Sequence, residues 1–412
     1  MLQLDFYSTL VAASLVLLLG RGLVARIGFL RAFNIPEPVA GGLLVAVLLL
    51  VLRLFADVEV RFDPSLQVPL MLAFFATIGL NADFASLKKG GRVLGIFLLV
   101  VTGLLVAQNA MGVVLAKALG LDPLMGLLAG SITLSGGHGT GAAWGAVFSE
   151  KYGVPSASEL AIASATFGLI LGGLIGGPVA RFLIKRVQTP GLGQAGQAGQ
   201  AGQADSRLPK GFEQPNEERL ITSFSFIETL ALLAISLQVG TLLSGYIQGT
   251  AFELPTFVCV LFVGVILRNG LSALGWHQVF EREVSVLGNV CLSLFLAMAL
   301  MSLKLWDLAA LALPVFILLA AQALMMALFA IFVTFRVMGS NYDAVVLAAG
   351  HCGFGLGATP TAIANMQAVT QRYGPSQIAF LVVPMVGAFF IDIMNAIVIK
   401  LYLALPFMGA GG

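Results

Sequence analysis

Long apolar stretches separated by short polar segments follow one another along almost the whole chain. A membrane-spanning helix needs roughly 20 mostly apolar residues. The blocks of about this length are 5–26, 37–55, 67–85, 92–119, 158–186, 221–248, 254–271, 284–303, 308–335 and 376–404. The pattern therefore predicts an all-α integral membrane protein with ten spanning helices surrounded by membrane lipids.

Two further apolar blocks, 123–149 and 343–370, are interrupted by glycine-rich sequence. Non-helical backbone at membrane depth is tolerated only where it is buried in protein or lines a wet cavity. Each block is long enough for two short helices that enter the membrane and return. We therefore expect two re-entrant hairpins whose tips meet near the middle of the membrane.

Local signals predict where these hairpins begin and break. The first begins with Asp122-Pro123, an N-cap followed by proline at the first helical position. We expect it to break over 135–141 and to resume its helix directly afterwards. The second is expected to break over 350–359, with Thr359 as the N-cap of its returning helix.

Each half of the chain has five predicted spans and one broken block between the last two. An odd number of spans places the halves in opposite orientations, which indicates an inverted repeat. A shift of about 221 positions aligns Asp122 with Asp343, Gly136 with Gly357 and Thr140 with Thr361. The predicted repeats are 1–189 and 220–412. Between them, 190–219 carries a Gln-Ala-Gly run and is expected to be a flexible cytoplasmic linker.

Composition and charge support a membrane location and give it an orientation. The chain is 58% hydrophobic and 10% charged, where soluble domains have about a quarter charged residues. A net charge of +2 without basic clusters among aromatics argues against nucleic-acid binding. Of 22 Lys and Arg residues, sixteen fall on one side of the predicted topology and six on the other. The first side is therefore cytoplasmic by the positive-inside rule, and both termini face outward.

The hairpin tips are the candidate binding site. Half-helix N-termini offer free N–H groups and positive dipole ends to an anion, and carbonyls at half-helix C-termini can hold sodium. Neither hairpin carries Lys or Arg, so a substrate carboxylate must be held by dipoles, amides and hydroxyls. The alternative is that the glycines only permit tight helix packing. The candidate substrate-binding residues are Ser135, Gly136, Gly137, His138, Thr140, Gly141, Gly355, Gly357, Thr359 and Thr361.

Several polar residues lie inside predicted spans, where they are costly and by default functional candidates. We predict that Asp392 binds sodium or the ammonium group of a substrate, with Asn395 beside it as a second sodium ligand. Asn365 could supply an amide oxygen to the cation. A purely structural, hydrogen-bonded role remains open for all three. Further polar residues precede the hairpins, namely Gln108, Asn109 and Gln322.

At these positions the chain resembles the bacterial glutamate:sodium symporter family. The likeness is carried by IPEPVAGGLL, PLMLAFFATIGLNA, LAGSITLSGGHGTGAAW, LAAGHCGFGLGATPTAIANMQ and FLVVPMVGAFFIDIMNA, and it extends over nearly the whole chain except the Gln-Ala-Gly run. The resemblance implies sodium-coupled uptake of L-glutamate across the bacterial inner membrane, with no organic cofactor. It also implies a homodimer with elevator-type motion. The matching loop residues are Ser135, Gly136, Gly137, His138, Gly139, Thr140, Gly141, Gly353, Gly355, Gly357, Thr359 and Pro360.

Three other functions are compatible with parts of this pattern. A di- or tricarboxylate symporter would also use dipole-lined tips, but it would not need a buried acid such as Asp392. A channel can also contain re-entrant loops. Ser135 and His138 invite comparison with a serine hydrolase, in which a base activates a hydroxyl. They are three positions apart among glycines, however, and the second loop lacks a serine. The sequence therefore favours a transporter over an enzyme.

Overall fold

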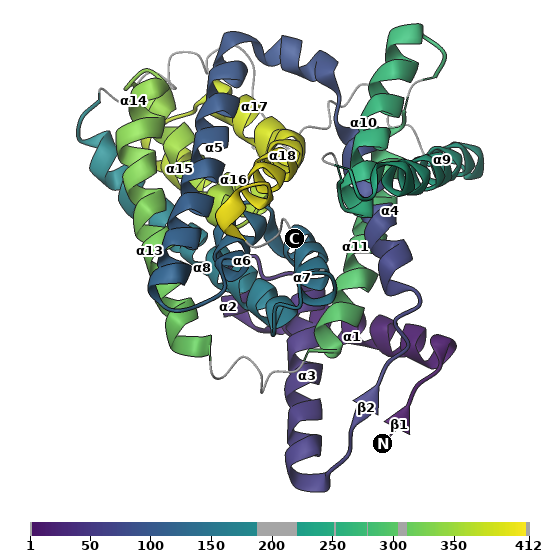
Figure 1. Cartoon of the computed structure of the whole chain (residues 1–412). Helices are drawn as coiled ribbons and strands as arrows, with labels where there is room; N and C mark the ends of the chain where they lie inside the picture. Colours follow the sequence, from purple (N-terminus) through teal and green to yellow (C-terminus); the bar gives the residue numbers. More distant parts are fainter. Residues whose placement is uncertain (1, 188–220, 251–252, 278, 304–310, 409–412) are drawn as a thin grey trace.

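The computed structural model describes residues 2–187, 221–250, 253–277, 279–303 and 311–408, and these residues are almost entirely helical (Figure 1). The exceptions include a short parallel pair of strands, β1 (Leu2–Gln3) and β2 (Val60–Arg61). The predicted linker 190–219 lies outside the described residues.

The first half of the chain consists of long helices with short helical segments between some of them. Its elements are α1 (Phe6–Arg26), α2 (Gly28–Ala32), α3 (Glu37–Ala56), α4 (Gln67–Asn81), α5 (Phe84–Ala118), α6 (Pro123–Leu127), the π-helical turn η1 (Leu128–Ile132), α7 (Gly137–Glu150) and α8 (Ala157–Ile184). Helix α5 is kinked at Gly91, whose φ of 58° lies in the left-handed region that glycine favours. The predicted span 92–119 corresponds to the part of α5 after this kink.

The second half also combines long helices with short, interrupted ones. Its elements are α9 (Ser223–Ile247), α10 (Thr256–Leu274), α11 (Glu281–Met301), α13 (Ala312–Phe329), η4 (Ala330–Thr334), α14 (Phe335–Val337), α15 (Tyr342–Leu356), α16 (Thr359–Tyr373), α17 (Gln377–Met385), η5 (Val386–Phe390), α18 (Ile391–Leu403) and η6 (Pro406–Met408). The span predicted over 376–404 is not one straight helix. It bends by 49° near η5, just after Pro384, which cannot donate a helical hydrogen bond.

Within the described part of the chain, eight helices are long and apolar enough to cross a membrane, and the bent pair α17–α18 makes a ninth. The tenth predicted span, 67–85, is the 15-residue helix α4, shorter than the roughly 20 residues that a span needs. Helix α4 is nevertheless central, because its Gly79 packs directly on Gly264 of α10. The prediction of a many-span helical protein is confirmed at this level.

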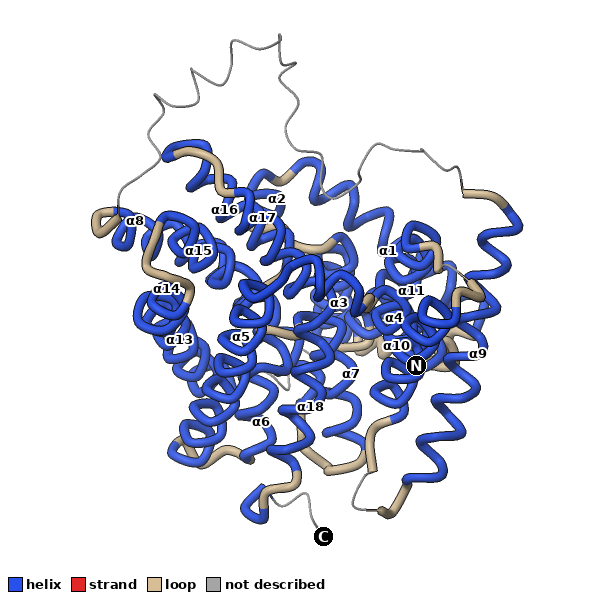
Figure 2. The backbone as a smooth tube through the Cα atoms, turned by 90° about the horizontal axis from the view of Figure 1, so that it is seen from above, coloured by secondary structure: helices blue, strands red, loops and turns tan. Residues whose placement is uncertain are grey.

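The helices pack in two groups, each drawn from both halves of the chain (Figures 1 and 2). The six-helix group consists of α1, α3, α4, α9, α10 and α11. The core group consists of α5 to α8 together with α13 to α18, and it contains both broken segments. Segments from opposite halves of the chain are therefore neighbours in each group.

Contacts between the two groups are mainly apolar. Trp144 of α7 meets Phe257 of α10 edge-on, with ring centroids 5.4 Å apart. Gly139 of α7 faces the Phe74 ring of α4 so closely that an added Cβ would lie 2.7 Å from it. At the end of α7, an ion pair joins Lys151 to Glu253 in the connection between α9 and α10.

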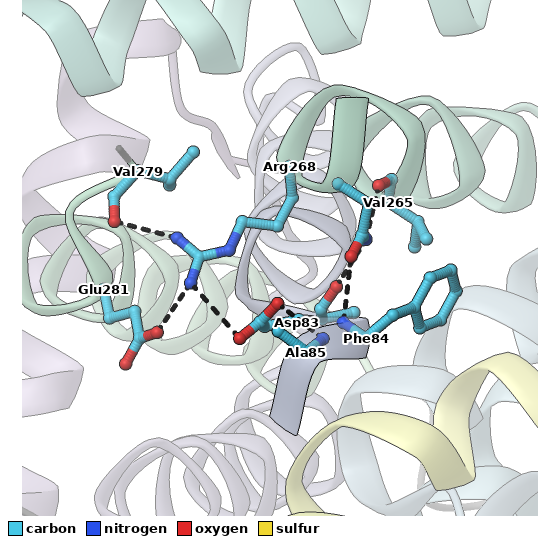
Figure 3. Close-up of polar contacts among 9 residues, drawn as sticks. Asp83, Phe84, Ala85, Val265, Arg268, Val279 and Glu281 are labelled. Carbon is cyan, nitrogen blue, oxygen red and sulfur yellow. Dashed lines mark hydrogen bonds and ion pairs between the residues drawn. The ribbon is translucent and has the colours of Figure 1, made fainter. Parts of the chain in front are cut away.

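The connection from α4 to α5, where the chain passes from one group to the other, is fixed to the end of α10 (Figure 3). Arg268 lies 2.7 Å from the carboxylate of Glu281 and 4.0 Å from that of Asp83. The Phe84 N–H donates to the side-chain oxygen of Asn269 at 2.9 Å. These bonds hold the start of α5 to the six-helix group, several residues before the kink at Gly91.

The breaks differ from the predicted ones. In the first segment the backbone leaves helical geometry at Gly130, a turn follows at 135–136, and 137–141 already belongs to α7, so the predicted break over 135–141 is wrong in its extent. In the second segment only 357–358 lies between helices, and the prediction of 350–359 is likewise wrong. The N-cap of α6 at Asp122 is confirmed, since its carboxylate accepts from the Leu124 N–H at 2.8 Å.

Close packing explains why the second break is so short. The glycines that suggested a break lie inside α15, where they let α16 approach: an added Cβ on Gly353 would overlap the backbone of Ala362. Gly350 similarly faces Met366, so α15 and α16 form a helical hairpin. The predicted N-cap at Thr359 is also wrong, because Thr359 is the first residue of α16.

Candidate binding site at the two breaks

The two breaks meet through a side chain of α5. The Ser135 hydroxyl, in the first break, donates to the amide oxygen of Gln108 at 2.7 Å. The amide nitrogen of Gln108 donates to the carbonyl of Gly355 at 2.7 Å, and the Ser135 hydroxyl lies 3.2 Å from the same carbonyl. Gly137, with a φ of 70°, faces the carbonyl of Gly357. Four of the predicted site residues are thus brought together at one place.

Buried amides anchor this meeting point. The Gln322 side chain donates to the backbone carbonyl of Gln108 at 2.8 Å, and the Asn109 side chain accepts from the Ser131 N–H at 3.0 Å. Asn395 uses both ends of its amide on Ser131, accepting from its hydroxyl at 2.6 Å and donating to its carbonyl at 2.9 Å. Asn395 therefore connects α18 to the first broken segment by two hydrogen bonds. Its predicted sodium-binding role stays a prediction.

His138, in the first turn of α7, is buried and bonded to α8. Its Nε2 lies 3.0 Å from the hydroxyl of Thr166. That hydroxyl donates its own proton to the Ile162 carbonyl at 2.8 Å, so it can only accept from the histidine. A neutral His138 then carries its proton on Nε2 and presents Nδ1 as an acceptor.

Asp392 and Thr140, both predicted site residues, face each other. Asp392 lies in the first turn of α18 and is partly buried. The Thr140 side chain, from α7, lies close to its carboxylate. The acid therefore lies beside the helix that starts at the first break, while Asn395, three residues later on α18, is engaged with Ser131.

The remaining predicted residues lie close to the two breaks. Gly136 and Gly141 lie in tight surroundings, because an added Cβ would lie 2.8 Å from the Thr140 side chain in one case and 2.9 Å from Thr133 in the other, and their predicted role in substrate binding stays a prediction. Asn365 donates from its amide to the carbonyl of Gly172 at 2.9 Å. Thr359 and Thr361 lie in the first turn of α16.

The site offers helix ends and neutral polar groups. The first turns of α7 and α16 present N–H groups without helical acceptors, which favour an anion. The last carbonyls of α15 favour a cation for the opposite reason. Among the described residues, no three His, Cys, Asp or Glu side chains gather as a metal site. Any cation held here must therefore rely mainly on carbonyl, amide and hydroxyl oxygens.

Comparison with known proteins identifies the family. The model of a family described as "Sodium/glutamate symporter" matches residues 2–375. The chain belongs to this family. It is 68% identical to the sodium/glutamate symporter of Escherichia coli K12 over 406 residues, which cover 98% of this chain and 99% of that one. It is 54% identical to the Haemophilus influenzae sodium/glutamate symporter over 398 residues, 97% of each chain.

Membership of a symporter family makes the chain a multi-pass membrane transporter and not an enzyme. Among solved structures, the sodium proton antiporter MjNhaP1 from Methanocaldococcus jannaschii aligns over 99% of both chains with a TM-score of 0.43 and 14% identity.

Two residues that hold the symporter's breaks together were not among the predicted site residues. Gln108 could be recognised as a costly polar residue in a span, but its partners could not. Ser131 gave no such signal, because a serine can bond within its own helix and needs no outside partner. Only the folded arrangement pairs it with Asn395, 264 positions away.

Proposed function

We propose that this protein catalyses sodium-coupled uptake of L-glutamate across the bacterial inner membrane. The observation that carries the proposal is the meeting of two broken helical segments at a polar site without cationic side chains. One partly buried acid, Asp392, lies beside this site. The relatives in Escherichia coli and Haemophilus influenzae, named sodium/glutamate symporters, support this substrate and coupling ion.

Each part of glutamate has a suitable partner near the breaks. Carboxylates can be held by N–H groups at the starts of α7 and α16, with the hydroxyls of Ser135 and Thr359. The ammonium group pairs with Asp392, which Thr140 orients. His138 would offer its Nδ1 acceptor or hold α7 against α8. These roles extend the predictions made for Gly355, Gly357 and the other loop residues.

The same proposal includes an inverted repeat and an elevator-type motion. The two halves would lie in opposite orientations with both termini outside, and the broken segments would be re-entrant hairpins. The core group would carry glutamate and sodium past a homodimeric six-helix group. Two features support this motion: the polar bonds around the breaks lie inside the core group, and its contact with the six-helix group is mainly apolar.

The alternative substrate is a di- or tricarboxylate. Such a substrate lacks an ammonium group, so it would place a carboxylate near Asp392 without compensation. The acid therefore favours an amino acid over a plain carboxylate.

Uptake into proteoliposomes tests the proposal. Radiolabelled L-glutamate should accumulate under an inward sodium gradient but not under an equal potassium gradient, and citrate should not compete. Asp392→Asn should lose uptake at least tenfold. Asp343→Asn is the matched control, because Asp343 bonds to Ser376 at 2.6 Å at the far end of α15. Sodium-driven citrate uptake would overturn the substrate assignment.

A further inference from the structure

The hydroxyl of Thr361 is buried without a hydrogen bond. Thr361 is 1% exposed, and its Oγ1 has no partner among the described residues. Buried hydroxyls are normally hydrogen-bonded, because leaving one without a partner destabilises the folded state. An unsatisfied hydroxyl buried next to the second break is a candidate ligand for an ion that binds there.

A backbone oxygen of α15 faces helix α8, which also packs against α16. The last four carbonyls of a helix have no helical N–H to accept from, and in α15 these begin with Gly353. The Gly355 carbonyl is already used by Gln108. The Gly353 carbonyl instead faces α8, where a Cβ built on Gly172 would lie 2.9 Å from its oxygen.

A third oxygen comes from Asn365, one turn after Thr361 on α16. Its amide nitrogen donates to the carbonyls of Gly172 at 2.9 Å and Ala349 at 3.3 Å. With the nitrogen engaged, the amide oxygen is the end of the side chain that remains for a ligand. Asn365 fits closely against α8, since a Cβ on Gly176 would overlap its amide.

The glycines of α8 contact all three residues that carry these oxygens. Gly172 touches both Gly353 and Asn365, and the Thr361 methyl group lies 3.7 Å from the position of a Cβ on Gly173. Any larger residue at 172 would push against the Gly353 carbonyl. The close approach of α8 to the hairpin of α15 and α16 therefore creates an oxygen-lined place without Lys or Arg.

We propose that the coupling sodium ion binds between α8, α15 and α16, with the Thr361 hydroxyl, the Asn365 amide oxygen and the Gly353 carbonyl as its protein ligands. This inference rests on the proposed sodium-coupled transport and deepens it. Hard cations are held by oxygen ligands of this kind, and the negative end of the α15 dipole favours a positive charge. Thr361, predicted to bind substrate, becomes a cation ligand.

The position explains how sodium and substrate are coupled. Two of the three proposed sodium ligands, Thr361 and Asn365, belong to α16, and the third, Gly353, belongs to the last turn of α15. The proposed carboxylate site at the start of α16 is therefore adjacent to the sodium site, and a bound cation lowers the electrostatic cost of the bound anion. Each ligand then increases the affinity for the other by the same factor.

Thermal unfolding of the purified full-length protein tests the site without transport. With no glutamate present, sodium chloride should raise the unfolding temperature of the wild type above its value in equal potassium chloride, because a ligand of the native state stabilises it. Thr361→Val should lose most of this sodium-specific shift, and Thr361→Ser should keep it. Thr370→Val is the control on the same helix, because the Thr370 hydroxyl already bonds to the Met366 carbonyl at 3.0 Å.

Uptake gives the second readout. Thr361→Val and Gly172→Ala should raise the sodium concentration for half-maximal uptake at least tenfold, and Thr370→Val should leave it within twofold. The site is overturned if Thr361→Val keeps both the sodium-specific shift and the wild-type sodium dependence. It is equally overturned if Thr361→Ser behaves like Thr361→Val. Failure of the transport proposal itself would appear separately, as wild-type protein without sodium-driven glutamate uptake.

Discussion

The interior of the core group and its contact with the six-helix group are built from different interactions. Around the breaks, fully buried amides at Gln108, Asn109, Gln322 and Asn395 hold segments that are far apart in the sequence. Between the groups, glycine and aromatic rings meet, with an exposed ion pair at one edge. The core group is therefore bonded internally as one body, whereas its outer contact opposes sliding much less.

Typical energies support this distinction. A buried polar group that loses its partner costs about 1–3 kcal/mol, whereas an exposed ion pair contributes about 0.2–1 kcal/mol. Apolar contacts are non-directional and can be exchanged for others when surfaces slide. Changes inside the core group should thus impair transport most, and changes at its edge should do so least.

Gln108→Leu should have the largest effect. It leaves the Gly355 carbonyl and the Ser135 hydroxyl without their amide partner, at about 2 kcal/mol or more together. If that energy is needed to hold the transport-competent arrangement, uptake should fall at least about 30-fold. The initial rate of glutamate uptake measures this. Gln322→Leu, which removes one hydrogen bond to a backbone carbonyl, should reduce the uptake rate less. Equal reductions by the two variants would contradict a special role for the place where the two breaks meet.

The residues of this network show what the sequence can and cannot predict. The cap at Asp122 is a local signal and was predicted correctly. The polar residues in spans were recognisable as costly, but the partner of Gln108 is a backbone carbonyl 247 positions away, which no local pattern indicates. Glycines such as Gly353 are ambiguous, because the same residue can break a helix or let another helix pack on it.

A crosslink across the group contact should have the next largest effect. Lys151→Cys/Glu253→Cys replaces the ion pair, and a bifunctional maleimide with a spacer as long as the two lost side chains should join the groups. If the core group moves past the six-helix group, crosslinked protein should lose uptake about in proportion to the crosslinked fraction. The native cysteines, Cys259, Cys291 and Cys352, are buried.

Two comparisons make this result specific. Each single-cysteine variant treated with the same reagent should keep its uptake, which separates crosslinking from simple modification. Crosslinked protein that still transports at the rate of the uncrosslinked double variant would exclude a sliding motion at this edge.

Arg268→Gln should lower stability more than transport. Arg268 is buried and bonded to the Val279 carbonyl at 2.8 Å and to Glu281, so its loss should cost about 1–3 kcal/mol. Because these bonds fix the α4–α5 connection and lie away from the breaks, the glutamate KM should change less than twofold. Denaturation of purified protein measures the first effect, and uptake measures the second. Arg282→Gln, at the exposed position next to Glu281, should change neither the stability nor the KM. A loss of stability there equal to that of Arg268→Gln would contradict the role assigned to Arg268.

Lys151→Gln should have the smallest effect, because both partners of its ion pair are accessible to solvent and such pairs contribute less than about 1 kcal/mol. The hydrogen bond from Lys151 lowers the pKa of Glu253 below its ordinary 4.5, and the bond to Glu253 raises the pKa of Lys151 above 10.5. The pair's contribution is therefore fully present between these ordinary values. It is lost as the pH falls through the lowered pKa of Glu253 or rises through the raised pKa of Lys151. Uptake by Lys151→Gln should stay within about threefold of the wild type. The ratio of variant uptake to wild-type uptake should be constant from about pH 5.5 to about pH 8, a range inside that window. A ratio that changes steeply in this range would show that the contact between the groups contains a titrating interaction other than this ion pair.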